Sequence, residues 1–386
     1  MAVVANFFLF FVVHSFVLLP VRIKQEGGSD TEIGIVIGVF GFVSVLLRPL
    51  AGLLADRVRT RTVALVGVAI VVVTMPLFVL ISGHGWQLIA LRGLLGVGWA
   101  CILSPLMALA TSLTPTDRLA ESLGVYGISG LVSNALAPLV GEWLVARGGF
   151  DLLFWADAAV AALSLVLVFA IPQRQLPAEQ LAAPASKSNG SGVLWLAVAG
   201  TVVLTMAHGA VRGSNLNFIA PFCLQLGLPR ASPFFVAFTV AALLTRFKLA
   251  ALPDRVGSVA VAIPTALLIA GNNLLITRLD STWLLIVVGL LGGLGQGLIF
   301  PALSVLMVKL LGEGRRAFAL SIYLTCFELG FSGGLPGFGA IADRAGYRWM
   351  YGVAAAVIAL ATGIFALLVG PLRSREKSTG ASRPAC

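Results

Sequence analysis

The sequence predicts an all-α membrane protein with twelve transmembrane helices in two pseudo-symmetric six-helix bundles. Of the 386 residues, 59% are hydrophobic and 11% are charged, whereas soluble domains carry about 25% charged residues. The apolar residues gather in runs of about 20, long enough for a helix to cross ~30 Å of hydrocarbon. The two halves of the chain also resemble each other. This composition excludes a soluble enzyme, a disordered chain and a coiled coil.

The expected helices follow one another with short connections. Strands of a membrane barrel would be about ten residues long and would alternate in polarity, which these runs do not. The first run starts at residue 2 and has no small-residue cleavage site, so we interpret it as a span and not as a signal peptide. The predicted spans are residues 2–21, 33–54, 62–82, 86–109, 122–141, 152–171, 193–213, 232–252, 258–277, 282–307, 317–338 and 347–370.

One long polar segment divides the chain at its centre. Residues 173–192 are rich in Pro, Ala, Ser and Gly and are predicted to form a flexible cytoplasmic linker. An N-terminal six-helix bundle is therefore expected over residues 1–172 and a C-terminal one over 193–371. Residues 372–386 would form a cytoplasmic tail.

The basic residues predict the orientation of the chain. The net charge is +10, but the basic residues are dispersed over short loops and form no continuous face for nucleic acid. Outside the spans, 15 Lys and Arg residues lie in even-numbered loops and the tail, and 7 lie in odd-numbered loops. The positive-inside rule then places both termini in the cytoplasm, with the lipid bilayer around the spans.

The halves of the chain repeat each other. Residues 48–57 align with 246–255, and each segment ends in Asp-Arg. At the same offset of 198, residues 138–141 align with 336–339, each beginning with Pro and ending with Gly. Matches at one offset and at equivalent places in span order indicate a duplicated six-span unit, with two bundles facing each other across a cavity.

Three segments resemble motifs of the major facilitator superfamily. Residues 52–61 are similar to the signature G-x-x-x-D-R-x-x-R-R, and residues 92–98 to R-x-x-x-G-x-G. Residues 137–142 are a degraded form of the antiporter motif G-P-x-x-G-G, with Ala137 and Glu142 in place of glycines. The motif residues are Gly52, Asp56, Arg57, Arg59, Arg61, Arg92, Gly96, Gly98, Pro138 and Gly141.

The resemblance covers nearly the whole chain and implies a function. It implies a monomeric secondary transporter of the bacterial inner membrane, working by alternating access and closest to the drug and metabolite efflux branch. Its partners would be protons and a small-molecule substrate, and export coupled to protons is the expected direction. The degraded antiporter motif leaves open an uptake symporter or a lipid-type flippase, and a non-transporting sensor is a further alternative.

The segment that carries the first motif is predicted to act as a conformational latch. Gly52 permits close helix approach, and Asp56 can face helix N-termini or arginines in one state and leave them in another. Arg57, Arg59 and Arg61 complete this segment. The alternative is an ordinary solvated loop with positive charge on the cytoplasmic side.

Ionisable residues within the spans are functional candidates, because each costs about 2.5–3.5 kcal/mol or more at the bilayer centre. Glu328 is expected near the midplane, where a carboxylate that can gain and lose a proton could provide coupling. Arg92, Asp157 and His14 are further coupling candidates, although Asp157 could instead be a structural partner of Arg92 or Arg212. Arg48 and Arg246 are interpreted as anchors at the membrane interface.

A set of polar residues within the spans is predicted to line the substrate cavity. A cavity shared by Arg92, Arg212 and Glu328 would carry a charge of about +1 or +2 and favour an anionic or zwitterionic substrate. The polar residues 213–217 are expected to break the seventh helix. The alternative for the amides and histidines is packing between helices. The full set is Arg92, Arg212, His208, Asn134, Asn215, Asn272, Gln296 and Glu328.

Motifs of other protein classes are missing from the sequence. There is no HExxH and no spacing of His and Cys typical of a metal site. The 4 cysteines are widely scattered, which argues against zinc and disulfides. We therefore expect no enzyme activity, no metal and no cofactor.

Overall fold

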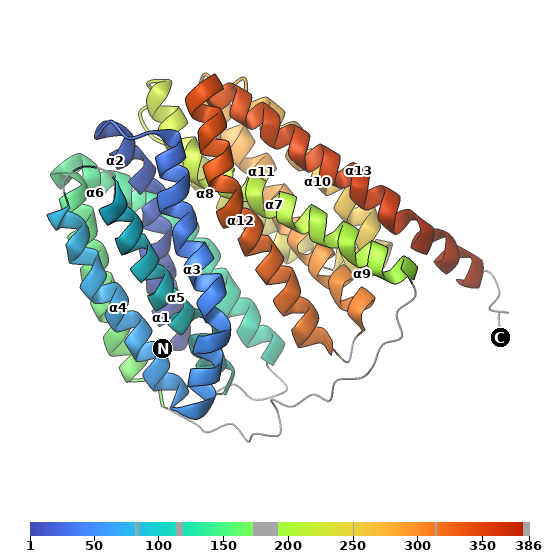
Figure 1. The fold of residues 1–386 in the computed structure, drawn as a ribbon, viewed down its shortest axis with the longest axis horizontal. Helices are drawn as coiled ribbons and strands as arrows, with labels where there is room; N and C mark the ends of the chain where they lie inside the picture. The colour runs from blue at the N-terminus through green and yellow to red at the C-terminus, as the bar shows by residue number, and fades with distance from the viewer. Residues whose placement is uncertain are drawn as a thin grey trace.

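The computed structural model describes residues 1–81, 83, 85–112, 119–172, 192–249, 251–312 and 315–380 (Figure 1). The regular elements of these residues are helices, which is the predicted fold class. They are α1 (Ala2–Ser15), the short 3-10 helix η1 (Phe16–Leu18), α2 (Leu19–Gln25), α3 (Asp30–Arg57), α4 (Thr60–Leu80), α5 (Trp86–Ser112), α6 (Leu119–Phe169), α7 (Gly192–Gln225), α8 (Ser232–Leu249), α9 (Leu252–Val256), α10 (Ser258–Ile276), α11 (Thr282–Leu311), α12 (Arg316–Ala345) and α13 (Tyr347–Gly380).

Helix α6 accounts for two of the predicted spans. Among the described residues, 11 helical segments are long and apolar enough to cross a membrane, and the one in α6 has 45 residues. That is about twice the length a single span needs. Within α6, Gly148 and Gly149 leave the helical conformation, and the φ of 70° at Gly149 lies in the left-handed region that favours glycine. When α6 is counted as two spans on either side of this break, the described helices give the twelve spans that were predicted.

Helix α7 corrects one prediction. It continues through residues 213–217, where a break was expected. Two of the polar side chains there bond to the helix itself: Ser214 Oγ donates to the Val211 carbonyl and Asn217 Nδ2 to the Gly213 carbonyl, both at 2.9 Å. Polar residues in a span do not break the helix when their side chains donate hydrogen bonds to its own carbonyl groups.

The chain folds into two helical halves that lie side by side (Figure 1). Helices α1 to α6 form one half and α7 to α13 the other, and the main contacts between them join α3 to α12 and α6 to α8. We call the end that carries the N-terminus and residues 172 and 192 the linker end, and the opposite end the distal end. The predicted linker, 173–192, lies outside the described residues except for its last one.

The two halves touch at the distal end and in the middle of the helices. A Cβ on Gly34 would lie 2.4 Å from the Leu335 carbonyl oxygen, and one on Gly38 would lie 2.6 Å from that of Ser332, so α3 and α12 are in backbone contact there. Toward the linker end, a Cβ on Gly52 would meet nothing within 4 Å. The close helix approach expected at Gly52 is therefore absent from this conformation, in which α3 and α12 diverge (Figure 1).

Exposed tryptophans mark the distal surface of the spans. Trp86, Trp283 and Trp349 stand in the first turns of α5, α11 and α13, and each is at least 70% exposed. Tryptophan is enriched where transmembrane helices reach the lipid head groups. The distal ends of these helices therefore lie at the height of one head-group layer.

Candidate functional site

An ion pair joins the two halves near the middle of the helices. Glu328 of α12 accepts a hydrogen bond from the Arg48 guanidinium of α3, with 2.6 Å between Nη2 and Oε2. Glu328 stands 12 residues into α12, about 18 Å along its axis, which agrees with the midplane position predicted for it. Arg48 was expected to be an anchor at the membrane interface, but its long side chain instead supplies the counter-charge of Glu328.

A second polar cluster lies inside the C-terminal half. His208, Arg212 and Asn215 share one face of α7 and surround a cavity of about 20 Å³ together with Asn272 and Gln296. His208 Nε2 lies 2.9 Å from Gln296 Oε1. These are five of the eight residues predicted to line a substrate cavity. The cavity has room for about one water molecule in this conformation.

Several polar atoms of this cluster are buried without a hydrogen-bond partner among the described residues. They include Nη1 of Arg212, Oδ1 of Asn215 and both amide atoms of Asn272. The Arg212 guanidinium also stacks on Phe238, 3.9 Å from the ring centre, and forms no ion pair with a described residue. A buried cation without a counter-charge is costly unless a ligand or water satisfies it, so this cluster has the chemistry of an anion site.

Two of the candidate ionisable residues, Arg92 and Asp157, are engaged within the N-terminal half. Arg92 is 3% exposed, and its guanidinium lies 4.6 Å and 4.5 Å from the ring centres of Phe16 and Phe40. Asp157 accepts a 2.6 Å hydrogen bond from Ser15. The ion pair of Asp157 with Arg92 or Arg212 is not formed, because Asp157 faces α1 while Arg92 is enclosed by aromatic rings.

The remaining candidates lie in separate places. His14 Nδ1 is 2.9 Å from Ser133 Oγ, and Asn134 donates to Thr239 of the other half at 3.1 Å. Arg92, Arg212 and Glu328 were predicted to share one cavity, but none of the described cavities contains all three. Of these three residues, Arg212 is the one that lines the small cavity of the C-terminal half.

The predicted latch segment makes no contact between the halves among its described side chains. Arg61 donates to the carbonyls of Phe169 and Ile171, each at 3.2 Å, and so binds the end of α6 in its own half. Arg57 and Arg59 are exposed. The side chain of Asp56 lies outside the described residues, so its predicted role stays a prediction.

The other motif residues act in helix packing. A Cβ on Gly96 would lie 2.5 Å from the Phe40 carbonyl oxygen, and one on Gly98 would lie 3.0 Å from that of Gly67. A Cβ on Gly141 would lie 2.7 Å from Cδ1 of Leu18. Pro138 stands within α6 about one turn before Gly141. These residues therefore let neighbouring helices approach closely.

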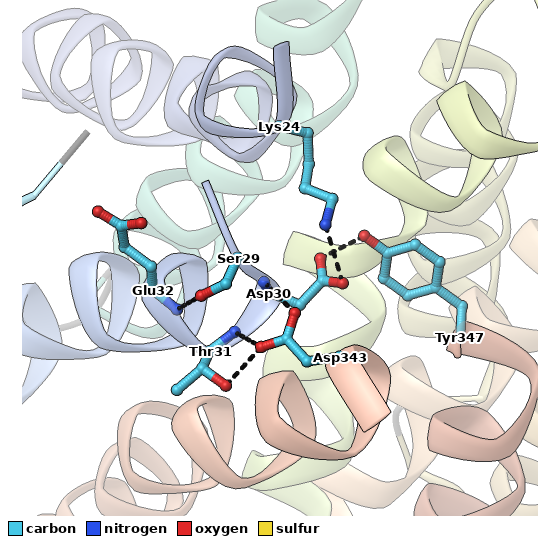
Figure 2. A network of polar contacts seen from close by, with 7 residues as sticks. All are labelled: Lys24, Ser29, Asp30, Thr31, Glu32, Asp343 and Tyr347. Carbon is cyan, nitrogen blue, oxygen red and sulfur yellow. Dashed lines mark hydrogen bonds and ion pairs between the residues drawn. The ribbon is translucent and has the colours of Figure 1, made fainter. Parts of the chain in front are cut away.

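At the distal end, a carboxylate of one half caps a helix of the other, which the sequence analysis did not predict. Figure 2 shows Asp343, near the end of α12, at the N-terminus of α3. Its oxygens accept from the backbone N–H groups of Asp30 and Thr31 at 2.7 and 2.8 Å and from the Thr31 hydroxyl at 2.6 Å. Asp30 in turn accepts from Lys24, at 3.1 Å, and from the Tyr347 hydroxyl.

The second contact between the halves repeats this arrangement. Glu142 of α6 accepts from the N–H groups of Ala231 and Ser232, at 2.7 and 3.0 Å, and from the Ser232 hydroxyl at 2.5 Å. Ser232 is the first residue of α8. A carboxylate at a helix N-terminus satisfies free N–H groups and faces the positive end of the helix dipole. We call these contacts of Asp343 and Glu142 the two distal caps.

Replacing both carboxylates of the distal caps is expected to open the distal end. In the variant Asp343→Asn/Glu142→Gln, each cap loses its charge and the hydrogen bonds to ionised groups, which are worth about 1.5–3 kcal/mol each. A single cysteine placed at Ser332, with the native cysteines replaced, should react faster with a membrane-impermeant thiol reagent added on the distal side. An equal rate in both backgrounds would contradict this, and Asp280→Asn, an exposed distal acid, serves as the control.

Two repeated helical halves with ionisable groups buried inside and between them are typical of secondary transporters. The chain matches the Major Facilitator Superfamily over residues 1–271 and again over 234–385, and it belongs to this family of secondary transporters. The resemblance predicted from the motifs is thereby confirmed. Because the family consists of transporters, the expectation of a membrane protein that is not an enzyme is also confirmed.

Similar proteins are known from bacteria. The staphylopine export protein of Staphylococcus aureus is 22% identical over 357 residues, covering 87% of this chain and 86% of that protein. The multidrug resistance protein MdtG of Citrobacter koseri is 27% identical over 370 residues, covering 88% and 86%. The crystal structure of the nucleoside transporter NupG shares the fold, with a TM-score of 0.74 at 16% identity over 95% of this chain and 98% of that one.

Proposed function

We propose that this transporter exports a small organic molecule in exchange for protons, by alternating access between its two halves. The observation that carries the proposal is the Arg48–Glu328 ion pair, which joins α3 to α12 at mid-membrane depth. A proton on Glu328 removes the charge that holds Arg48, so proton binding and separation of the halves become linked. The export function named for one similar protein, the staphylopine export protein, supports the direction.

We further propose that the linker end faces the cytoplasm of a bacterial inner membrane, with both termini on that side and the protein acting as a monomer. The excess of basic residues in the loops at this end supports that orientation. The structure then represents a state closed to the outside and open to the cytoplasm. In the opposite state, the distal caps separate and the segment 52–61 closes the cytoplasmic side.

Alternating access requires two units that move relative to each other. We place the moving units at residues 1–172 and 193–371, joined by a linker that lets them tilt against each other. Contacts between the units at the distal end include the charged hydrogen bonds of the two distal caps. Contacts of this kind can break and re-form during a transport cycle at modest cost.

The cluster around Arg212 supports a substrate with an anionic group. Its guanidinium offers hydrogen-bond donors in a planar fork that suits a carboxylate or phosphate. His208, Asn215, Asn272 and Gln296 would hold the polar remainder of the substrate. The small cavity of this state would widen when the helices around it move apart.

Replacing Arg212 with glutamine is expected to reduce transport of an anionic substrate about tenfold or more, the effect of losing one hydrogen bond between charged groups. Counterflow of labelled substrate in proteoliposomes measures this without a proton gradient. Arg278→Gln, which removes an exposed distal arginine, should transport normally. Unchanged counterflow in Arg212→Gln would show that the anion binds elsewhere.

The experiment that tests the proposed function uses proteoliposomes with an internal pH dye. A panel of anionic, zwitterionic and cationic metabolites and drugs is applied to the wild-type protein. Export in exchange for protons predicts a pH change with particular compounds, in opposite directions for substrate added inside and outside. Counterflow without any proton movement would show a uniporter, and proton movement in the same direction as the substrate would show a symporter.

A further inference from the structure

A groove of about 860 Å³ lies between the two halves at the distal end. One wall comes from α2 and α6, with Val21, Leu139 and Phe150, and the other from the end of α7 and the connection to α8, with Leu224 and Leu228. Sites for small-molecule ligands usually measure about 300–1,000 Å³. We call this feature the distal groove.

The surface of the distal groove is mainly apolar. Leu18, Ala220 and Cys223 are buried in its floor, at most 4% exposed. Leu139 and Leu224 stand on its two walls and are 42% and 44% exposed. Exposed leucines at membrane depth are unfavourable in water and favourable beside hydrocarbon. The occupant that suits these walls is therefore an acyl chain.

The charged residues of the distal groove leave it with two unpaired cations. Its carboxylate, Glu142, is already occupied by three donors from Ala231 and Ser232. Arg147 stacks on Trp143, 4.2 Å from the ring centre, and neither Arg147 nor Arg230 forms an ion pair with a described residue. Both arginines line the groove and are exposed.

The two arginines also lie at the right height for a lipid head group. Arg147 precedes the break of α6 at Gly148, and Arg230 lies in the connection between α7 and α8, so both are at distal chain turns. Leu139 stands eight residues before Arg147, about 12 Å deeper along α6, where acyl carbons lie. The guanidinium group binds phosphate through paired hydrogen bonds.

We propose that the distal groove binds one anionic phospholipid, with its phosphate held by Arg147 and Arg230 and its acyl chain on the apolar floor. Charge complementarity selects this occupant over a zwitterionic lipid. Because its walls come from both halves, the bound lipid bridges them and favours the conformation in which the distal caps are closed. This inference does not depend on the substrate or on proton coupling.

The test compares phosphatidylglycerol with phosphatidylcholine of the same acyl chains, added to the purified full-length protein in detergent. Native mass spectrometry measures the bound lipid, and thermal unfolding measures the stabilisation. The wild type should retain more phosphatidylglycerol and gain the larger increase in Tm. In Arg147→Gln/Arg230→Gln, the apparent affinity for phosphatidylglycerol should fall about tenfold or more, to that for phosphatidylcholine.

The matched control is Arg278→Gln/Arg344→Gln, which removes two exposed distal arginines outside the groove and should keep the preference. A third variant, Ala146→Trp, fills the groove and should reduce binding of both lipids without changing any charge. Equal binding of the two lipids by the wild type would overturn the proposal. So would a preference that survives both the double arginine variant and Ala146→Trp.

Discussion

Replacing Glu328 with glutamine is expected to abolish substrate-driven proton movement in proteoliposomes. Glutamine keeps the size of the side chain but cannot release a proton, and it removes the counter-charge of Arg48, 2.6 Å away. Removing one partner of a buried ion pair lowers the stability of a protein by about 3–5 kcal/mol. The two side chains are 19% and 26% exposed, so we expect the lower end of that range. An internal pH dye reports the flux.

The double variant Arg48→Gln/Glu328→Gln separates coupling from stability. Without either charge, no unpaired ion is left between α3 and α12, so thermal stability should return close to the wild-type value. Proton movement should remain absent because the titratable group is missing. Proton flux that persists in Glu328→Gln would move the coupling site to His14 or Asp157.

A leucine at Gly38 is expected to prevent closure of the distal end and to stop transport. Its Cβ would lie 2.6 Å from the Ser332 carbonyl oxygen, a backbone atom that no side-chain rotation can move away. Overpacking of this kind costs typically about 1–3 kcal/mol, which shifts the balance between two states by about 5- to 150-fold. Faster labelling of a distal cysteine, at Leu335→Cys, measures the opening.

Gly52→Leu provides the matched control on the same helix. In the present conformation its Cβ would meet nothing within 4 Å, so the distal end should stay closed and distal labelling slow. If the segment 52–61 closes the opposite side, this variant should also lose transport, but by blocking the other state. Wild-type labelling and transport in Gly38→Leu would show that contact between α3 and α12 is not required.

Local sequence patterns predicted the helices correctly. The spans follow from apolar runs, and the Gly148–Gly149 break lies within the predicted connection between 122–141 and 152–171. His208, Arg212 and Asn215 come together because residues three and four apart share a helix face. The expected break at 213–217 was wrong because the side chains of Ser214 and Asn217 bond to their own helix.

The contacts between the halves could not be predicted in the same way. Arg48 and Glu328 are 280 residues apart, and Asp30 and Asp343 are 313 apart, so their meeting depends on how α3 and α12 cross. The internal repeat does contain a pattern that points to the two distal caps. It aligns 138–141 with 336–339, and a carboxylate follows shortly after each of these segments, in Glu142 and Asp343.

The two distal caps have a consequence for how this protein can vary during evolution. Each cap joins a specific carboxylate to backbone N–H groups, which every residue except proline possesses. Positions 30, 31, 231 and 232 can therefore change side chain and still be capped, whereas positions 142 and 343 must remain acidic. Within each cap, natural variation should therefore be found at the capped positions and not at the carboxylate. Proline is the one replacement that the capped positions exclude.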